Sequence, residues 1–184
     1  MAITISGSGI TSANIADDTI VNSDINSSAA IAQSKTASLV GGDLPAGSVL
    51  QVVQATSDTA TTPNTSWTDI NGASVTITPS STSSKILINF NVGGMTTSQA
   101  DNISLKLLRD STSIRVSSRY GYSTTGWESV PLSYIYLDSP STTSSVTYKV
   151  QTKTDVDNDY RLNSDQSNNG GDNGLVMIAM EIAG

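Results

Sequence analysis

The feature that most restricts the fold of this chain is a set of short segments in which apolar and polar residues alternate. In the segment 84–92, SKILINFNV, every second residue from Ile86 to Val92 is apolar, and 145–152, SVTYKVQT, alternates in the same way. A period of two residues is that of a β-strand with one buried face, whereas a helix needs spacings of three and four. Good helix formers nowhere cluster with a helical period, so the chain is predicted to be all-β.

Turn-forming residues separate these segments at intervals of about 8–15 residues, which is typical of an antiparallel β-sandwich. Asn71-Gly72 is predicted to turn a hairpin between 66–70 and 73–79, and Asp110–Thr112 to turn another. The apolar run 175–182 is typical of a central, buried strand. We therefore expect a jelly-roll-like sandwich of about eight to ten strands over residues 44–184. The remaining expected strands are 48–54, 84–92, 103–109, 113–118, 130–138, 145–152 and 159–163.

Residues 1–43 are predicted to form a separate, extended N-terminal arm. They contain no aromatic residue, and five of their isoleucines follow a spacing of five residues before the last one: Ile10, Ile15, Ile20, Ile25 and Ile31. That period fits neither a helix nor a strand, and a chain this short cannot bury its own row of isoleucines. Repeats of this kind need neighbours, so we expect the arm to order on assembly, with the isoleucines anchoring it to other protein. The alternative is a low-complexity arm that stays disordered.

Composition argues against several classes of partner. The net charge is −7, with nine Lys plus Arg against 16 Asp plus Glu, and no basic patch is visible that would neutralise several phosphates. Nucleic acid is therefore not an expected partner, and an anionic bilayer is disfavoured for the same reason. No apolar stretch is long enough to cross a membrane, so we expect no membrane insertion. The first residues carry no basic region before a long apolar run, so no signal peptide is expected.

The sequence offers little for catalysis. It has no His and no Cys, so neither can serve as a base or a nucleophile, and no phosphate-binding or nucleophile-elbow motif occurs. We therefore expect no enzymatic activity and no cofactor. One weak Ca²⁺ candidate is the alternating set Asp155, Asp157 and Asp159, although Tyr160 stands where an EF-hand loop needs glycine. A solvated acidic loop is the alternative.

A second candidate site is a group of aromatic residues in the Gly-containing segment RYGYSTTGWES. Tyr120, Tyr122 and Trp127 could stack on sugar rings if they are exposed on a loop. The alternative is that they cap the sandwich core or fill a subunit interface. Trp67, which lies in an expected strand, is predicted to belong to the core.

Three stretches of the sequence resemble tailed-phage virion surface proteins. They are GITSANIADDTIVNSDINSSAAIAQSK in the arm, SWTDINGASVTITPSSTSSKILI with the later LKLLRDSTSI, and YLDSPSTTSSVTYKVQTKT with the closing apolar strand. This combination is similar to capsid decoration (cement) proteins and to the C-terminal β-sandwich domains of tail fibres and tailspikes. The resemblance implies a homotrimer on the virion surface, made in the host cytoplasm, whose N-terminal part attaches to the particle and whose sandwich faces solvent.

The short chain favours a capsid decoration protein over a fibre, because a fibre must reach the host. The expected partner is then the major capsid protein of the phage, with the arm lying between capsid subunits. The alternative is the receptor-binding tip of a tail fibre or tailspike. Such a tip would join tail or baseplate proteins and recognise host surface polysaccharide with its loops.

Overall fold

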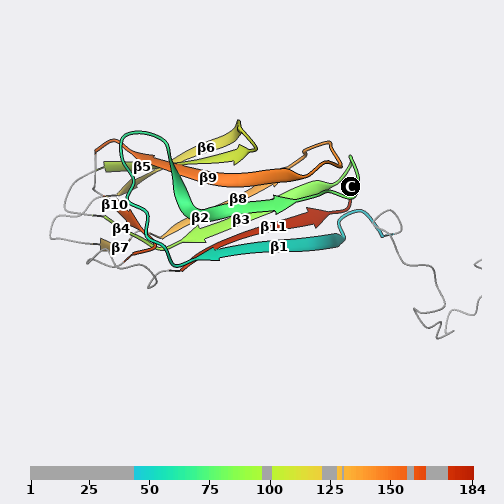
Figure 1. Ribbon diagram of the computed structural model, residues 1–184, viewed down its shortest axis with the longest axis horizontal. Helices are drawn as coiled ribbons and strands as arrows, with labels where there is room; N and C mark the ends of the chain where they lie inside the picture. Colours follow the sequence, from blue (N-terminus) through green and yellow to red (C-terminus); the bar gives the residue numbers. More distant parts are fainter. Residues whose placement is uncertain (1–43, 97–100, 122–127, 130, 157–159, 165–173) are drawn as a thin grey trace, which may run out of the picture. The chain divides into compact units, whose positions relative to one another are not determined.

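The computed structural model describes residues 44–96, 101–121, 128–129, 131–156, 160–164 and 174–184 (Figure 1). The predicted arm, 1–43, lies outside these residues and stays a prediction. The described chain is all-β, as the alternation predicts, and none of it forms a helix that could cross a membrane. In chain order the strands are β1 (Val49–Ser57), β2 (Thr68–Ile77), β3 (Lys85–Val92), β4 (Gly94–Thr96), β5 (Asp101–Arg109), β6 (Thr112–Gly121), β7 (Glu128–Ser129), β8 (Leu132–Asp138), β9 (Val146–Thr154), β10 (Tyr160–Leu162) and β11 (Leu175–Ile182).

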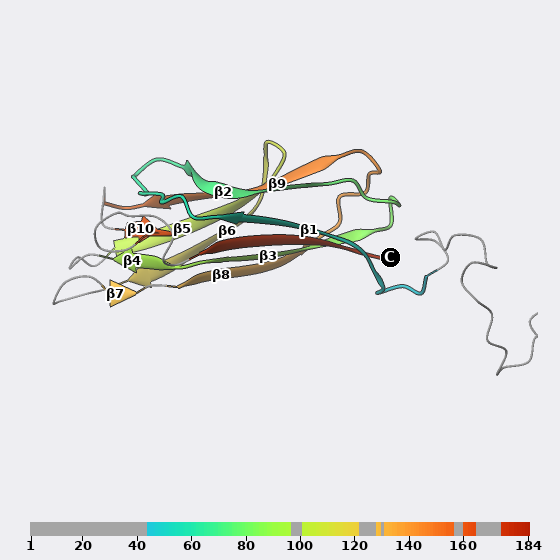
Figure 2. The same cartoon turned by 60° about the horizontal axis from the view of Figure 1, so that its bottom comes forward.

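Two four-stranded antiparallel sheets pack face to face as a sandwich (Figure 2). We call them the β11 sheet, in the order β1-β11-β3-β8, and the β9 sheet, in the order β2-β9-β5-β6. A third, small sheet, β10-β4-β7, lies at one end. The predicted β-sandwich is confirmed.

The strand pairs of the two large sheets are nested in the sequence. β5 pairs with β6, β3 with β8, β2 with β9 and β1 with β11, so each pair encloses the one before it. A long hairpin of nested pairs that rolls into two facing sheets is a jelly roll. The predicted jelly-roll-like architecture therefore follows from the observed strand order.

The core lies between the two inner faces. Strand β3 buries Ile86, Ile88, Phe90 and Val92, the alternate residues that the sequence pattern selects. The central strands β9 and β5 oppose them with residues such as Tyr148, Val150 and Leu107. Burying each large aliphatic side chain stabilises the fold by about 1.5–3 kcal/mol before ordering costs.

The hairpin predicted at Asn71-Gly72 is wrong. Both residues lie inside the single strand β2, where the register with β9 shifts between Asp69 and Ser74. Gly72 has a φ of +78° and lies against Ser57 of β1. A glycine in this left-handed conformation forms a bulge that bends a continuing strand as readily as it forms a turn. The hairpin predicted at Asp110–Thr112 is confirmed by the β5–β6 pairing.

Trp67 is not in the core, which is the second correction. It is half-buried, and the ammonium groups of Lys106 and Lys153 lie 4.2 Å and 5.5 Å from the centre of its ring. The indole therefore packs beneath two lysines, where the attraction between a cation and an aromatic face favours it. From the sequence alone, a tryptophan in an expected strand is predicted to be a core residue. The two lysines that cover its ring come from distant segments, so the sequence around Trp67 does not reveal them.

We predict that Gly72→Ala destabilises the fold by more than Gly47→Ala. Both glycines have positive φ, which costs alanine about 1–2 kcal/mol, but only at Gly72 would a Cβ overlap the side chain of Ser57. No atom lies near a Cβ added at Gly47. Urea denaturation of both variants measures the difference. Equal losses would show that the bulge at Gly72 does not press against β1.

Candidate interaction surface

Most of the sequence-predicted site residues lie outside the described part of the chain. This holds for the five arm isoleucines, Ile10, Ile15, Ile20, Ile25 and Ile31, and for Tyr122 and Trp127. Tyr120 is in strand β6, where its backbone pairs with Asn102. The proposed clustering of these aromatics therefore stays a prediction.

The weak Ca²⁺ candidate is only partly described. Asp155 is exposed and accepts a hydrogen bond of 2.9 Å from the side chain of Asn102, while Asp157 and Asp159 lie outside the described residues. Among the residues that the structure describes, no group of three or more acidic, His or Cys side chains is placed to hold a metal ion. The Ca²⁺ site is a hypothesis that these residues neither support nor oppose.

Both ends of the described chain meet at one end of the sandwich. The backbone N–H of Gly47 donates to the carbonyl of Ala183 at 2.7 Å, and the N–H of Ala183 donates to the carbonyl of Ser48 at 2.8 Å. We call this the arm end, because the predicted arm precedes residue 44. Lys85 opens β3 here, opposite Ile182.

Two buried carboxylates close the arm end of the core. Glu181 and Asp138 both lie opposite Ile86, one on β11 and one on β8, and their exposed fractions are 1% and 6%. Inward carboxylates are costly unless other groups satisfy them. Each of these two is held by hydrogen bonds that reach beyond its own strand.

Glu181 joins β11 to β1 and to the β2–β3 connection. Its carboxylate accepts hydrogen bonds from the Gln51 amide at 2.6 Å and from the backbone N–H and hydroxyl of Ser80, both at 2.7 Å. Burial tends to raise the pKa of Glu181, but these donors outweigh it and hold the pKa below its usual value. The Gln51 amide also donates to the Thr78 carbonyl at 2.7 Å, which ties the two sheets together.

Asp138 ties the β11 sheet to the β9 sheet. It accepts a hydrogen bond of 2.6 Å from the Tyr148 hydroxyl and forms an ion pair of 3.0 Å with Arg109. Burial, followed by the hydrogen bond to Asp138, raises the pKa of Tyr148 far above its usual value, so this hydroxyl keeps its proton and donates. The ion pair of Arg109 is therefore formed within one chain, between its two sheets.

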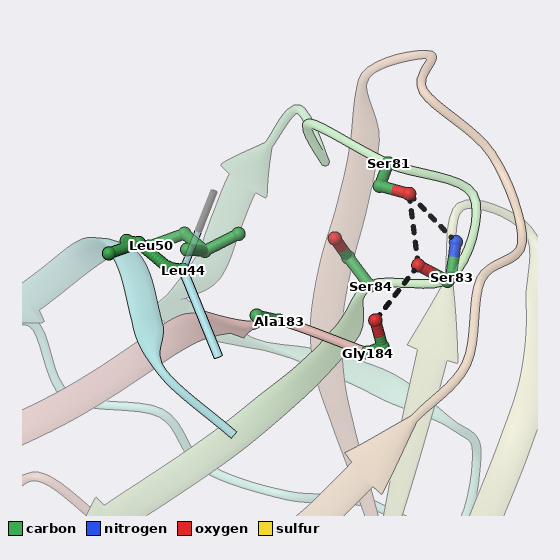
Figure 3. A pocket seen from close by; sticks show the side chains of 7 residues that line it. All are labelled: Leu44, Leu50, Ser81, Ser83, Ser84, Ala183 and Gly184. Atoms are coloured by element: carbon green, nitrogen blue, oxygen red, sulfur yellow. Dashed lines mark hydrogen bonds between the residues drawn. The ribbon is translucent and has the colours of Figure 1, made fainter. Parts of the chain in front are cut away.

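A small pocket of about 70 Å³ lies beside this polar cluster (Figure 3). Leu44 and Leu50 lie on one side of it, and the Ser81–Ser84 turn lies on the other, with the last two residues between them. Ligand pockets usually measure about 300–1,000 Å³, so this one has room for only a few water molecules.

The outer face of the β11 sheet is apolar near the arm end, whereas its far row, Thr56, Val176, Asn91 and Ser133, is mostly polar. The register places Val52, Met180, Leu87 and Leu137 side by side in one row across all four strands. The next row contains Gln54, Ile178, Asn89 and Ile135. The side chains on the two edge strands are the most exposed: 57% for Val52, 65% for Ile135 and 49% for Leu137.

The outer face of the β9 sheet is polar by contrast. The hydroxyls of Thr76 and Thr147 hydrogen-bond across β2 and β9 at 2.9 Å, and Asp69 accepts from both Lys149 and Gln151. The hydrogen bond from Lys149 lowers the pKa of the exposed Asp69 carboxyl. The two faces of one sandwich therefore differ in chemistry, and only the β11 sheet resembles a surface that other protein covers.

This apolar face was not identified from the sequence. Strand β11 is central, as predicted, but Val176, Ile178, Met180 and Ile182 on its outer side are only half-buried. An apolar run on both faces of a strand looks like full burial from sequence. A second apolar segment in the sequence could have revealed the face. In β8, Ile135 and Leu137 alternate with Tyr134 and Tyr136, so they must point outward when the tyrosines pack against the core.

No protein-family model matches the sequence, and no curated protein matches it. Three solved structures are similar to parts of the fold. The dimeric latent PorU from Porphyromonas gingivalis has a TM-score of 0.42 and 9% identity, covering 76% of this chain and 13% of that chain. The structure of the infectious bursal disease virus Gx strain has a TM-score of 0.40 and 12% identity, covering 74% of this chain and 34% of that chain. The VP2 subviral particle of infectious bursal disease virus has a TM-score of 0.35 and 16% identity, covering 73% of this chain and 33% of that chain. This chain thus spans 34% or less of each of those chains.

We predict that Glu181→Gln destabilises the protein by about 1–3 kcal/mol at neutral pH, because a satisfied buried carboxylate is replaced. The folded-state pKa of Glu181 is below its usual 4.5, so its contribution is full above that pH and is lost as the pH falls through the folded pKa. The gap between wild type and variant should therefore narrow below about pH 4.5. Urea denaturation across pH 3–7 measures it, with the exposed Asp58→Asn as control. A gap that does not change with pH would contradict the assignment.

We predict that Tyr148→Phe costs about 1–3 kcal/mol of unfolding free energy, because it removes a donor from the buried Asp138 carboxylate. Tyr134→Phe is the matched control. The Tyr134 hydroxyl is buried and has no hydrogen-bond partner among the described residues, so its removal should not destabilise the protein. Thermal or urea unfolding compares the two variants, and equal losses would refute the role given to the Tyr148–Asp138 contact.

Proposed function

We propose that the protein is a non-enzymatic structural component of a tailed-phage particle. In this proposal it is a homotrimeric capsid decoration protein on the virion surface. The N-terminal arm anchors it to the major capsid protein, and the sandwich faces solvent. The resemblance of three sequence stretches to phage virion proteins suggests this class. The jelly-roll architecture is compatible with it, since viral capsid domains and lectins both use this fold, although fold alone does not define function.

The observation that carries the proposal is that the two ends of the sandwich differ: the predicted arm joins the domain at one end. Strand β1 begins, and β11 ends, at the arm end, where Val49 lies opposite Ile182. The opposite end of the sheet, at Ser57 and Leu175, is about 25 Å away, from a rise of about 3.3 Å per residue. A domain that is joined to its arm at one end of the sandwich has the form that an anchored surface knob requires.

The arm supplies the anchoring energy in this proposal. Each isoleucine that becomes buried against other protein stabilises the attachment by about 1.5–3 kcal/mol, before the cost of ordering the arm is subtracted. Five such side chains in each of three arms give multivalent attachment, in which one bound arm raises the local concentration of the others.

The second candidate is the receptor-binding tip of a tail fibre or tailspike. The observation that favours it is the place of Tyr120. The β5–β6 turn lies at the arm end, where Arg109 bonds Asp138, so the backbone of Tyr120, near the other end of β6, is far from the arm end. In this proposal the aromatic residues Tyr120, Tyr122 and Trp127 contact host polysaccharide.

We predict that deletion of residues 1–40 leaves a folded sandwich that no longer attaches to particles. The sandwich has its own core, so the circular dichroism spectrum and cooperative unfolding should persist. Co-sedimentation with particles that lack the protein measures attachment, with the full-length chain as the positive control. Attachment of the deleted form at the full-length level would contradict anchoring by the arm.

A further inference from the structure

We propose that the outer face of the β11 sheet is the surface through which copies of this chain associate. This inference deepens the proposed function and rests on it for the expectation that copies of the chain form a trimer. The polar outer face of the β9 sheet then remains in solvent. The occupant of the apolar face is the same face of the two neighbouring copies, with the three faces turned toward one axis.

The first argument is the chemistry of the face. An antiparallel sheet commonly keeps one face on the core and turns polar side chains to water on the other. Here the row Val52, Met180, Leu87 and Leu137 crosses the full width of the sheet without a polar residue. Isolated surface aliphatics need no explanation, but a contiguous row on four strands marks a contact surface.

The second argument is charge. The chain carries 16 Asp plus Glu, yet none of the outward-facing residues of the four strands is acidic. The one charged residue on this face is Lys85, at the arm end. Copies with a net charge of −7 repel one another through most of their surface. A face without acidic residues is the part of such a molecule that can meet its own copy without opposing carboxylates.

The third argument is size and shape. Four strands about 4.8 Å apart, with seven to nine residues each at about 3.3 Å, give a face of roughly 19 Å by 25 Å. Three such faces around one axis cover roughly 1,400 Å² in total, which is within the size range of specific protein–protein interfaces. Sheet faces with aliphatic side chains pack about 10 Å apart, so identical faces can interdigitate. Three faces turned toward one axis would bury the same rows in a closed trimer.

Sedimentation velocity of the full-length protein at micromolar concentration tests the inference. Two variants place a carboxylate on the face from opposite edges, Ile135→Glu on β8 and Val52→Glu on β1. Ser74→Glu is the matched control, because it adds the same charge to an exposed position of the β9 sheet opposite Lys149. Circular dichroism and unfolding curves establish that each variant is folded.

We expect wild type and Ser74→Glu to sediment as a multiple of the 19.1-kDa chain, with three chains the expected number, and both face variants to sediment as single chains. A wild-type protein that sediments as a single chain would overturn the inference, as would folded face variants that keep the wild-type mass. If those variants keep their mass and still attach to particles, the face assignment fails while the proposed function stands. Particle binding by the full-length chain therefore reports on the function separately.

Discussion

The packing of two alternating sheet faces against each other is the constraint on which the rest of this structure depends. Inward residues such as Phe90 and Ile88 meet Tyr148 and Val150, and the nested pairing of the strands brings these distant segments together. Because alternation fixes which side of each strand is buried, it also fixes which side is turned outward. The apolar outer face of the β11 sheet and the polar face of the β9 sheet are consequences of the same registers.

At the arm end, the chain enters the sandwich next to two buried carboxylates that hold neighbouring strands together. Glu181 holds β1 and the β2–β3 connection, while Asp138 holds the β9 sheet through Tyr148 and Arg109. Hydrogen-bonded buried carboxylates stabilise a unique arrangement when all their donors are present. These contacts join β1, β8 and β11 to the β2–β3 connection and to the β9 sheet at this end of the sandwich.

The fold was largely predictable from the sequence, and the site was not. The alternation in SKILINFNV and SVTYKVQT identifies strands because the period of a strand is local. Asn71-Gly72 misled, since whether a left-handed glycine ends a strand or bends it depends on Ser57 of a different strand. The apolar row on the outer face of the β11 sheet was not predicted for the same reason. Val52, Leu87 and Leu137 become neighbours only through the pairing of strands that are far apart in the chain.

The central claim is that this sandwich is an anchored, repeated component of a phage head. Quantitative mass spectrometry of purified particles, with isotope-labelled peptides of this chain and of the major capsid protein, tests it most directly. The account predicts hundreds of copies per particle, in a fixed ratio to capsid subunits. A few dozen copies or fewer, or removal together with the tails when heads are purified, would contradict it and favour the tail-tip candidate.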